Sequence, residues 1–411
     1  MAGRVLIVGG GIAGFALARA LRQRDIPFAV VDRLDGPPDA GLGLNLPGNA
    51  VQALRALGVG DELARRGAPI RRREYRNAKG RLLFSVDEAA FWGDALTPVC
   101  VRRGDLLELL RDGVAPDAVR WRAAVTDVSA SPDRVDVRLD DGSTEAYDLV
   151  VGADGVHSAV RRGMLGHAAP RPALLTAASW RFVIADSTVD CWSVWLGTKG
   201  GFLLIPVDAK HVYAYASATR GGPVGADAGW LTATFADFPE PVPRVVAAAL
   251  AEPSSLYHSP MAEVRVPRWS RGRVVLIGDA AHATAPVWAQ GAALAVEDAL
   301  VLADLLAAGD DWAGVGEEYE RRRRQRVAHV QAMTDRLSRV ARLPGWLRDA
   351  LAPVVGPAPT AKRTVHSGNR CHEGVASWSR RSCGDCWPRP RSLSARGSPR
   401  CTRRTAGRSG W

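Results

Sequence analysis

The sequence has 411 residues, 47% of them hydrophobic, which is enough to build the cores of two or three domains. Its net charge of +11 is concentrated at one end: residues 362–411 contain 12 Lys and Arg against 2 Asp and Glu, while residues 1–361 contain 42 against 41. A nearly neutral body argues against nucleic-acid binding, and a body whose cysteines are Cys100 and Cys191 argues against a disulfide framework.

The N-terminus has some features of a signal peptide, because Arg4 precedes the largely apolar residues 5–18. Four glycines between residues 9 and 14 would break the apolar helix that such a signal needs. No other uninterrupted apolar run reaches about 18 residues, the length that a membrane helix requires. The sequence therefore predicts no membrane span and, by default, a cytoplasmic protein.

A glycine-rich turn follows the apolar residues 5–8, which predict a buried strand. Gly9, Gly11 and Gly14 have the spacing of a dinucleotide-binding turn. Gly9 would make the tight turn, Gly11 would let the backbone approach a pyrophosphate, and Gly14 would let the next helix pack on the strand. Ile12 and Ala13 begin this predicted helix, which extends to about residue 24.

A second apolar strand at residues 28–31 ends in Asp32, whose carboxylate can accept hydrogen bonds from both ribose hydroxyls of an adenosine. A glycine-rich turn without a ligand is the alternative. The agreement of strand, turn, helix, strand and terminal acid favours a dinucleotide site.

Two further segments lead into predicted helices. Arg103 stands just before a predicted helix, where it could reach a phosphate or simply be solvated. Residues 147–151 predict a buried strand that continues into Gly152, Asp154 and Gly155, after which a helix begins. Because the carboxyl ends of strands meet at one edge of a doubly wound sheet, these turns should converge on one crevice.

Residues 173–266 differ in character, since their strand-like runs are rich in aromatic and β-branched side chains. We expect a β-rich insertion that acts as a lid or pocket wall. Most of its aromatic residues should be core, but one face could line a cavity: Trp180, Trp192, Trp195, Phe202, Tyr213 and Tyr215.

The third turn is the centre of the sequence. Residues 274–277 predict a buried strand that ends in Gly278 and Asp279, and a loop with Pro286 leads to a predicted helix after Gly291. The unpaired N–H groups and positive dipole end of this helix favour negative charge in front of it. A strand, an acid, a proline loop and an anion-binding helix end would suit a reducible cofactor.

The C-terminal part contains a long charged helix and an atypical tail. Residues 317–343 predict the helix, and the acidic residues near its run Arg321–Arg324 favour a solvated surface. Residues 362–411 lose all periodicity. Their cysteines allow a zinc hypothesis, but the spacing fits no standard site, and translation of a GC-rich gene in a shifted frame explains the composition better.

Taken together, the three turns resemble those of class A flavoprotein monooxygenases, the single-component group that includes p-hydroxybenzoate and salicylate hydroxylases. The glycine turn with Asp32 and Arg33 is similar to the family's FAD fingerprint, Asp154 and Gly155 to its DG motif, and Gly278 and Asp279 to its GD motif. The resemblance implies FAD contacts for Arg103 and a ribityl contact for Asp279.

The implied fold is α/β, with a Rossmann-like FAD-binding domain, an inserted β-sheet substrate domain and a C-terminal helical region. We expect the FAD-binding domain in residues 1–172 and 267–310, the substrate domain in 173–266, helices in 311–361, and the basic tail in 362–411. A monomer or homodimer is expected.

The sequence departs from the family after Pro286. Trp288 stands where the family has a glycine-rich turn, and it could narrow the substrate cavity, fix the flavin or fill space. The backbone N–H groups near Gly291 and Ala292 can still face the flavin pyrimidine ring, since that contact needs no side chain.

The implied reaction is hydroxylation of an aromatic or polycyclic small molecule, with NADPH or NADH as transient reductant, O₂ as co-substrate and a flavin C4a-hydroperoxide as intermediate. No metal is required. Candidates for the substrate side are Arg181, Tyr213, Tyr215 and Trp288, with His211 and His258 as further possible bases. A reductase or dehydrogenase of the same superfamily and a flavin-binding scaffold without turnover are the alternatives; a flavin-dependent halogenase is disfavoured because its WxWxIP signature is absent.

Overall fold

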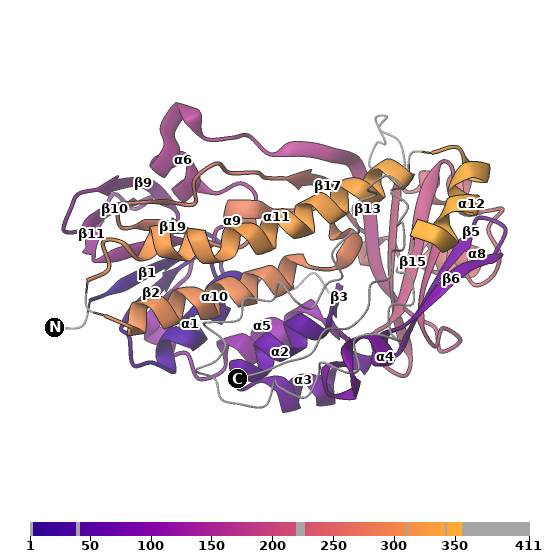
Figure 1. Ribbon diagram of the computed structural model, residues 1–411, viewed down its shortest axis with the longest axis horizontal. Helices are drawn as coiled ribbons and strands as arrows, with labels where there is room; N and C mark the ends of the chain where they lie inside the picture. The colour runs from indigo at the N-terminus through magenta and orange to yellow at the C-terminus, as the bar shows by residue number, and fades with distance from the viewer. Residues whose placement is uncertain (1–2, 38–41, 219–226, 310, 342, 356–411) are drawn as a thin grey trace, which may run out of the picture.

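The computed structural model describes residues 3–355 apart from residues 38–41, 219–226, 310 and 342. The hypotheses for the tail, a zinc site and a shifted reading frame, lie outside the described residues. The described chain forms two sheet-centred parts, and the long helix α11 runs from the first part to the second (Figure 1).

A six-stranded sheet forms the centre of the first part, in the order β18-β19-β12-β1-β2-β8. The five strands from β19 to β8 are parallel, and β18 pairs antiparallel with β19. Every residue of β1, β12 and β19 is buried, as expected of parallel strands covered on both faces. The bounds are β1 (Val5–Val8), β2 (Phe28–Val31), β8 (Val119–Arg120), β12 (Leu149–Gly152), β18 (Ser270–Arg271) and β19 (Val274–Leu276).

Helices cover this sheet and share one large hydrophobic core with it. Helix α1 packs against both α10 and α5, which brings the first and last thirds of the chain together. The helices here are α1 (Ile12–Arg22), α2 (Gly48–Ala56), α3 (Gly60–Arg66), α5 (Arg103–Arg111), α6 (Ala159–Leu165), α9 (Asp279–His282) and α10 (Gly291–Ala307).

Two small sheets complete this part. A hairpin of β10 (Val135–Leu139) and β11 (Thr144–Tyr147), extended by β9 (Val125–Ala130), precedes β12. Residues 43–46 form β3 (Gly43–Leu46), which pairs with β7 (Val99–Arg102); β7 also pairs with β4 (Ala68–Pro69).

The second part is built on a seven-stranded sheet in the order β17-β13-β16-β15-β14-β5-β6. Two of its strands come from residues 72–87, outside the range 173–266 expected for the substrate domain; β5 pairs in parallel with β14. The bounds are β5 (Arg72–Asn77), β6 (Leu82–Asp87), β13 (Ala173–Ala185), β14 (Trp192–Leu196), β15 (Gly200–Pro206), β16 (His211–Ala218) and β17 (Tyr257–Glu263).

The two faces of this sheet differ. On one face Trp180, Trp195 and Phe202 pack into a core with α7 (Gly229–Phe235) and α8 (Val242–Ala251). On the other face Trp192 and Tyr213 join a cluster that includes Ala289 from the loop before α10. The alternation of side chains along each strand thus divides the predicted aromatic set between a core and a wall that faces the first part.

The C-terminal helices connect the two parts. α11 (Val315–Ala341) runs from beside β18 towards β13 and β17, and α12 (Gly345–Val355) packs against β6 (Figure 1). The predicted helix at 317–343 is therefore confirmed with slightly earlier bounds. The mixed α/β architecture agrees with the predicted fold class.

Candidate functional site: a cofactor groove at the parallel sheet edge

The glycine turn between β1 and α1 is close-packed where the fingerprint requires it. Gly9 has φ +113°, and a Cβ built there would lie 2.4 Å from the Ala153 carbonyl oxygen. A Cβ on Gly14 would lie 1.8 Å from the Gly9 carbonyl oxygen, so the first turn of α1 needs a glycine. At Gly11, by contrast, no described atom lies within 4 Å of that position, which leaves room for a phosphate group to approach the backbone.

Asp32 lies directly beside this turn at the end of β2. Its Oδ2 accepts a hydrogen bond from the Gly10 N–H at 2.6 Å, and its Oδ1 accepts one from the Leu34 N–H at 2.9 Å. A carboxylate has about four lone-pair directions, so two remain for ribose hydroxyls. Arg33, the other predicted contact at this strand end, is exposed.

In the second turn, after β12, one carboxylate oxygen of Asp154 binds the start of a helix. Asp154 Oδ2 accepts hydrogen bonds from the N–H groups of Ala159 and Val160, at the start of α6. Burial raises the pKa of Asp154, and its Oδ1 has no hydrogen-bond partner within the described residues. Gly155 has φ +74°, and the space where its Cβ would point is open.

Arg161 fastens the second turn to the third. This arginine is 2% exposed and donates from one Nη to the Val156 carbonyl at 2.6 Å and from the other to the Ala280 carbonyl at 2.8 Å. The segments after β12 and β19 therefore hold a fixed separation.

The third turn, after β19, places Gly278 against α1 and α10. Gly278 has φ +57°, and a Cβ there would lie 3.0 Å from Ala13 Cβ, so the residue type is fixed by both backbone and packing. The next residue, Asp279, is exposed, yet enough protein surrounds its carboxyl to raise the pKa, while the charges of His282 and Arg103 oppose that rise. Arg103 Nε is buried without a hydrogen-bond partner in the described structure.

The loop to α10 continues this edge. Pro286 begins a short 3₁₀ helix, η5 (Pro286–Trp288), and Ala289 follows with φ +53°. Gln290 is the N-cap of α10, so the N–H groups of Gly291 and Ala292 lie in the first turn of a 17-residue helix. Around Gly291 no described atom lies within 4 Å of a built Cβ, and the positive end of the helix can approach a ligand.

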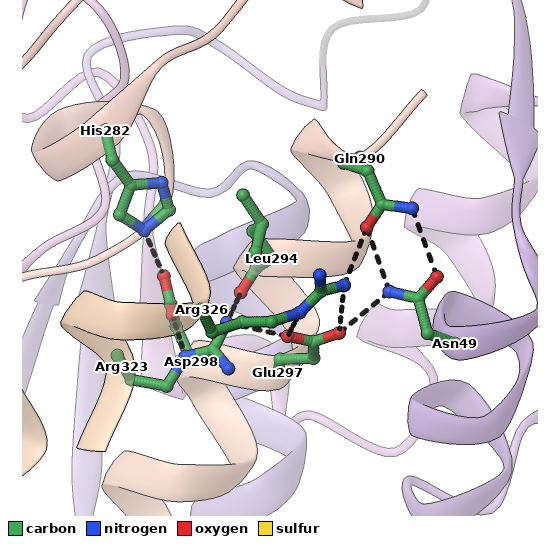
Figure 2. A network of polar contacts seen from close by, with 9 residues as sticks. Asn49, His282, Gln290, Leu294, Glu297, Asp298, Arg323 and Arg326 are labelled. Carbon is green, nitrogen blue, oxygen red and sulfur yellow. Dashed lines mark hydrogen bonds and ion pairs between the residues drawn. The ribbon is translucent and has the colours of Figure 1, made fainter. Parts of the chain in front are cut away.

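A buried polar network holds the turn at Gly278 and the loop before α10 in place (Figure 2). Asp298 of α10, which is fully buried, accepts a hydrogen bond from the Gly278 N–H at 2.9 Å. Its carboxylate also pairs with His282 Nε2 at 2.7 Å and with Arg323 Nε at 2.7 Å. Burial alone would raise the pKa of Asp298, but the charges of His282 and Arg323 outweigh it and lower the pKa to about 2.

The adjacent Glu297 holds the loop before α10. Its carboxylate pairs with Arg323 and Arg326 of α11, and its Oε1 accepts from Asn49 Nδ2 at 2.8 Å. Asn49 and Gln290 exchange two hydrogen bonds, and Arg326 donates to Gln290 Oε1 at 3.0 Å (Figure 2). Gln290 is thereby fixed from α2, α10 and α11 at once.

One member of this network, Arg323, corrects the expectation of a solvated arginine run. Arg321, Arg322 and Arg324 do pair with Glu318 and Glu320 near the surface, but Arg323 is 5% exposed. The helical period turns one residue of any four consecutive positions towards the packed neighbour. The adjacent acids Glu297 and Asp298 in the largely apolar helix α10 were the signal for buried basic partners.

The sheet face that carries Trp192 and Tyr213, the wall, contains the predicted substrate-side residues. Arg181, Tyr213 and Tyr215 share one face of the seven-stranded sheet, and the Arg181 guanidinium lies 5.9 Å from the centre of the Tyr215 ring. Tyr213 packs beside Gly43 of β3, since a Cβ there would lie 2.5 Å from Tyr213 Cβ. Burial raises the pKa of both tyrosines, and the Tyr215 hydroxyl donates to Met261 Sδ at 2.8 Å.

The two histidine candidates lie on different faces of the sheet. His211 begins β16 on the same face as Tyr213, at the end of the strand, where its Nδ1 contacts Asp208 Oδ1 at 2.9 Å. His258 packs on Trp180 with ring centres 4.5 Å apart, on the opposite face of the sheet from Arg181. The structure therefore does not bring His258 to the wall with Tyr213.

Trp288 lines a narrow cavity of about 30 Å³ between the loop and the wall. Across this cavity Arg73 lies over the Trp192 ring at 4.6 Å and pairs with the buried Glu88 at 2.8 Å. The remaining lining residues are Asn45, Pro47, Val86, Phe91, Trp92, Pro98 and Gln290. Trp288 therefore narrows the space at the junction of the two parts.

Comparisons with known proteins agree with this geometry. Residues 3–336 match the family model described as an FAD binding domain. The chain belongs to this FAD-binding family. It is 32% identical to the 2-heptyl-3-hydroxy-4(1H)-quinolone synthase of Pseudomonas aeruginosa, over 88% of this chain and 96% of that protein. It is also 32% identical to the 3-amino-4-hydroxybenzoate 2-monooxygenase PtnB3 of Streptomyces platensis, over 88% and 93%.

A solved structure of a relative shows the same fold with its ligands. HpxO of Klebsiella pneumoniae, complexed with FAD and uric acid, is 27% identical and superposes with a TM-score of 0.78 over 86% of this chain and 92% of that one. The predicted membership of the FAD-dependent aromatic monooxygenases is confirmed, and so is FAD as the cofactor. The open space at Gly11 and Gly291 and the unpaired Arg103 Nε and Asp154 Oδ1 fit such a group.

The described residues also bear on metal sites and membrane spans. Within residues 3–355, less the gaps given above, no three or more His, Cys, Asp or Glu side chains gather as a metal site would require. Across the same residues, no helix has the length and apolar character to cross a membrane.

Proposed function

We propose that this FAD-dependent monooxygenase uses NADPH or NADH and O₂ to hydroxylate an aromatic or polycyclic small molecule. The observation that carries the proposal is the position of Arg181, Tyr213 and Tyr215 on a sheet face opposite the edge where the three turns meet. By their names, relatives of this chain synthesise a quinolone or act on an aminohydroxybenzoate or urate, all of them flat ring compounds.

The residues of this chain divide the work of binding FAD. Asp32 would hold the adenosine ribose, Gly11 would allow the pyrophosphate to approach, and Asp279 would accept from the ribityl chain. Arg103 would donate to a phosphate, and the N–H groups of Gly291 and Ala292 would face the pyrimidine ring. The positive end of α10 favours negative charge at that ring by roughly 0.3–2 kcal/mol.

When bound, FAD supplies hydride acceptance from NAD(P)H and activation of O₂; a route through a flavin C4a-hydroperoxide stays a prediction. The wall contributes exclusion of water, because Val194, Leu203 and Ile205 surround Tyr213 with apolar surface. Burial raises the pKa of Tyr213 and Tyr215, so neither hydroxyl is suited to act as a base near neutral pH. The Tyr215 O–H already donates to Met261 Sδ, so Tyr213 is the hydroxyl that would donate a hydrogen bond to substrate.

Arg181 is the natural partner for an anionic or carbonyl substituent of the substrate. Its charge lies among tyrosine rings on a largely apolar wall, where a hydrogen bond to an oxygen is stronger than in water. Trp288 would limit the space for substrate on the side of Trp192, because the two tryptophans line a cavity of about 30 Å³ there.

The test is oxidation of NADH and NADPH in air by the flavin-loaded protein, across phenols, quinolones, aminohydroxybenzoates and urate, with ¹⁸O₂ to follow oxygen into product. Substrate-stimulated oxidation with ¹⁸O in the product supports the proposal. Oxidation without oxygen transfer would identify a reductase or dehydrogenase, and bound flavin without stimulated oxidation would identify a scaffold. Failure to bind FAD would contradict the assignment altogether.

A further inference from the structure

Trp121 has no role in the motifs or in the function proposed above, yet it lies at one end of the cofactor groove. It follows directly after β8, the strand at the outer edge of the parallel sheet, next to β2. Its ring packs against Phe15 of α1 with centroids 6.2 Å apart, and the side chain as a whole is half-buried. A large aromatic side chain therefore borders the groove with part of its surface accessible.

The indole and the Asp32 carboxylate are neighbours. A Cβ built on Gly10 would lie 3.1 Å from Trp121 Cη2 and 3.4 Å from Asp32 Oδ2, so both groups lie against the same point of the turn. Gly10 is one of the variable positions of the dinucleotide fingerprint, and here the indole is what makes a side chain difficult to place there.

The backbone fixes this arrangement. Asp32 donates its N–H to the Arg120 carbonyl at 3.0 Å, and Ala123 donates to the Asp32 carbonyl at 2.9 Å. Arg122 donates to the Leu34 carbonyl at 2.8 Å from a left-handed conformation with φ +54°, which few side chains adopt. Three hydrogen bonds around a sharp bend thus hold Trp121 at the end of β2.

We propose that Trp121 stacks against the adenine ring of FAD and is a specificity-determining residue for the adenosine half of the cofactor. The inference rests on the proposal that Asp32 holds the adenosine ribose. A base is joined directly to its ribose, so the adenine must lie within a few ångströms of that carboxylate, where the indole is. With the ribose at Asp32, the flavin end would lie on the opposite side of β1, towards β19 and α10 and away from Trp121.

The test compares Trp121→Leu with the wild-type full-length protein, both freed of FAD and titrated with FAD, ADP and FMN. Trp230→Leu is the matched control, because Trp230 is also half-buried and packs edge-on to a phenylalanine, Phe235, at 5.5 Å, far from the groove. Loss of one base–aromatic stack should weaken FAD and ADP binding by the same factor, between about 5-fold and about 150-fold. FMN, which lacks the adenosine, should bind unchanged, and Trp230→Leu should match wild type.

The proposal is overturned if Trp121→Leu binds ADP as tightly as wild type, or if it weakens FMN as much as FAD, since the indole would then act only through the fold. Should Trp121→Leu not fold, Trp121→Phe provides the same comparison with a smaller loss for FAD and ADP. Wild-type protein that binds neither FAD nor ADP would instead contradict the proposed function.

Discussion

The two sides of the groove are built by different means. On the cofactor side, each turn is fixed by backbone contacts and by a network in which Asp298 and Glu297 hold Gly278 and Gln290. On the substrate side, Tyr213 and its neighbours are held by packing between sheet strands, and Arg181 contributes a charge. Several independent contacts therefore fix each turn on the cofactor side. Side chains on the wall can be substituted without moving the strands that carry them.

The largest expected effect is on the cofactor side. Asp298→Ala should lower the free energy of unfolding by about 3–5 kcal/mol, because it leaves His282 buried without its carboxylate partner and Arg323 with Glu297 alone. Chemical denaturation measures this. Glu318→Gln, which removes an exposed partner of Arg321 and Arg322, is the control and should cost less than about 1 kcal/mol. Equal losses in the two variants would show that the buried network contributes no more to stability than a surface ion pair.

On the substrate side the effect should appear in turnover rather than stability. Arg181→Met should lower kcat/KM for the identified substrate by roughly 10-fold to 100-fold, the loss of a hydrogen bond to a charged group, with unfolding nearly unchanged. Arg181→Lys keeps the charge and should retain part of the rate. NAD(P)H oxidation without substrate is the internal reference, and a change confined to that background rate would place Arg181 outside substrate binding.

Two glycines of the first turn allow the effect of packing on stability to be measured separately from the effect of ligand approach on FAD binding. Gly14→Ala should destabilise the protein by about 1–3 kcal/mol, because the new methyl group would meet the Gly9 carbonyl at 1.8 Å. Gly11→Ala adds a methyl group into open space, so it should leave the unfolding temperature unchanged and weaken FAD binding. Thermal melts and FAD titrations together test both. Normal FAD binding by Gly11→Ala would place the pyrophosphate elsewhere.

The free energy of unfolding should also depend on pH through Asp298 on the cofactor side. The folded-state pKa of Asp298 is lowered to about 2 from an ordinary 3.8, so its contribution is complete above about pH 4 and is lost as the pH falls towards 2. Wild type should lose roughly 1–2 kcal/mol more than Asp298→Ala across that window. Denaturant titrations at pH 5, 4 and 3 measure the slopes. Parallel slopes would mean that Asp298 does not carry its low pKa in the folded state.

Sequence reasoning located the strands, turns and helices of the cofactor side because each is encoded within about ten residues. Gly9 to Gly14 and Gly278 to Gly291 carry their own turn chemistry, and the parallel register at β1, β12 and β19 follows from buried apolar runs. Three features escaped it. The pairing of β5 with β14, the depth of Arg323 and the position of Trp121 all depend on partners more than 20 residues away.

The wall was predicted only in part for the same reason. Aromatic enrichment indicated a β-rich segment, but which face each side chain takes depends on register with neighbouring strands. The pairing of Arg181 with Tyr215 and of Trp180 with His258 decides that the former lie on the wall and the latter behind it. No local pattern distinguishes Trp192 from Trp195.

The parallel pairing of β5 with β14 has a consequence for synthesis of the chain. Arg73 is paired with Trp192, so 119 residues must be added after Arg73 before its strand partner exists. At roughly 5–20 residues per second, the hairpin of β5 and β6 waits about 6–24 s on the ribosome with one edge unpaired. Arg72, Glu74 and Arg76 alternate along that edge, and such charges discourage pairing with another nascent chain until the proper strand emerges.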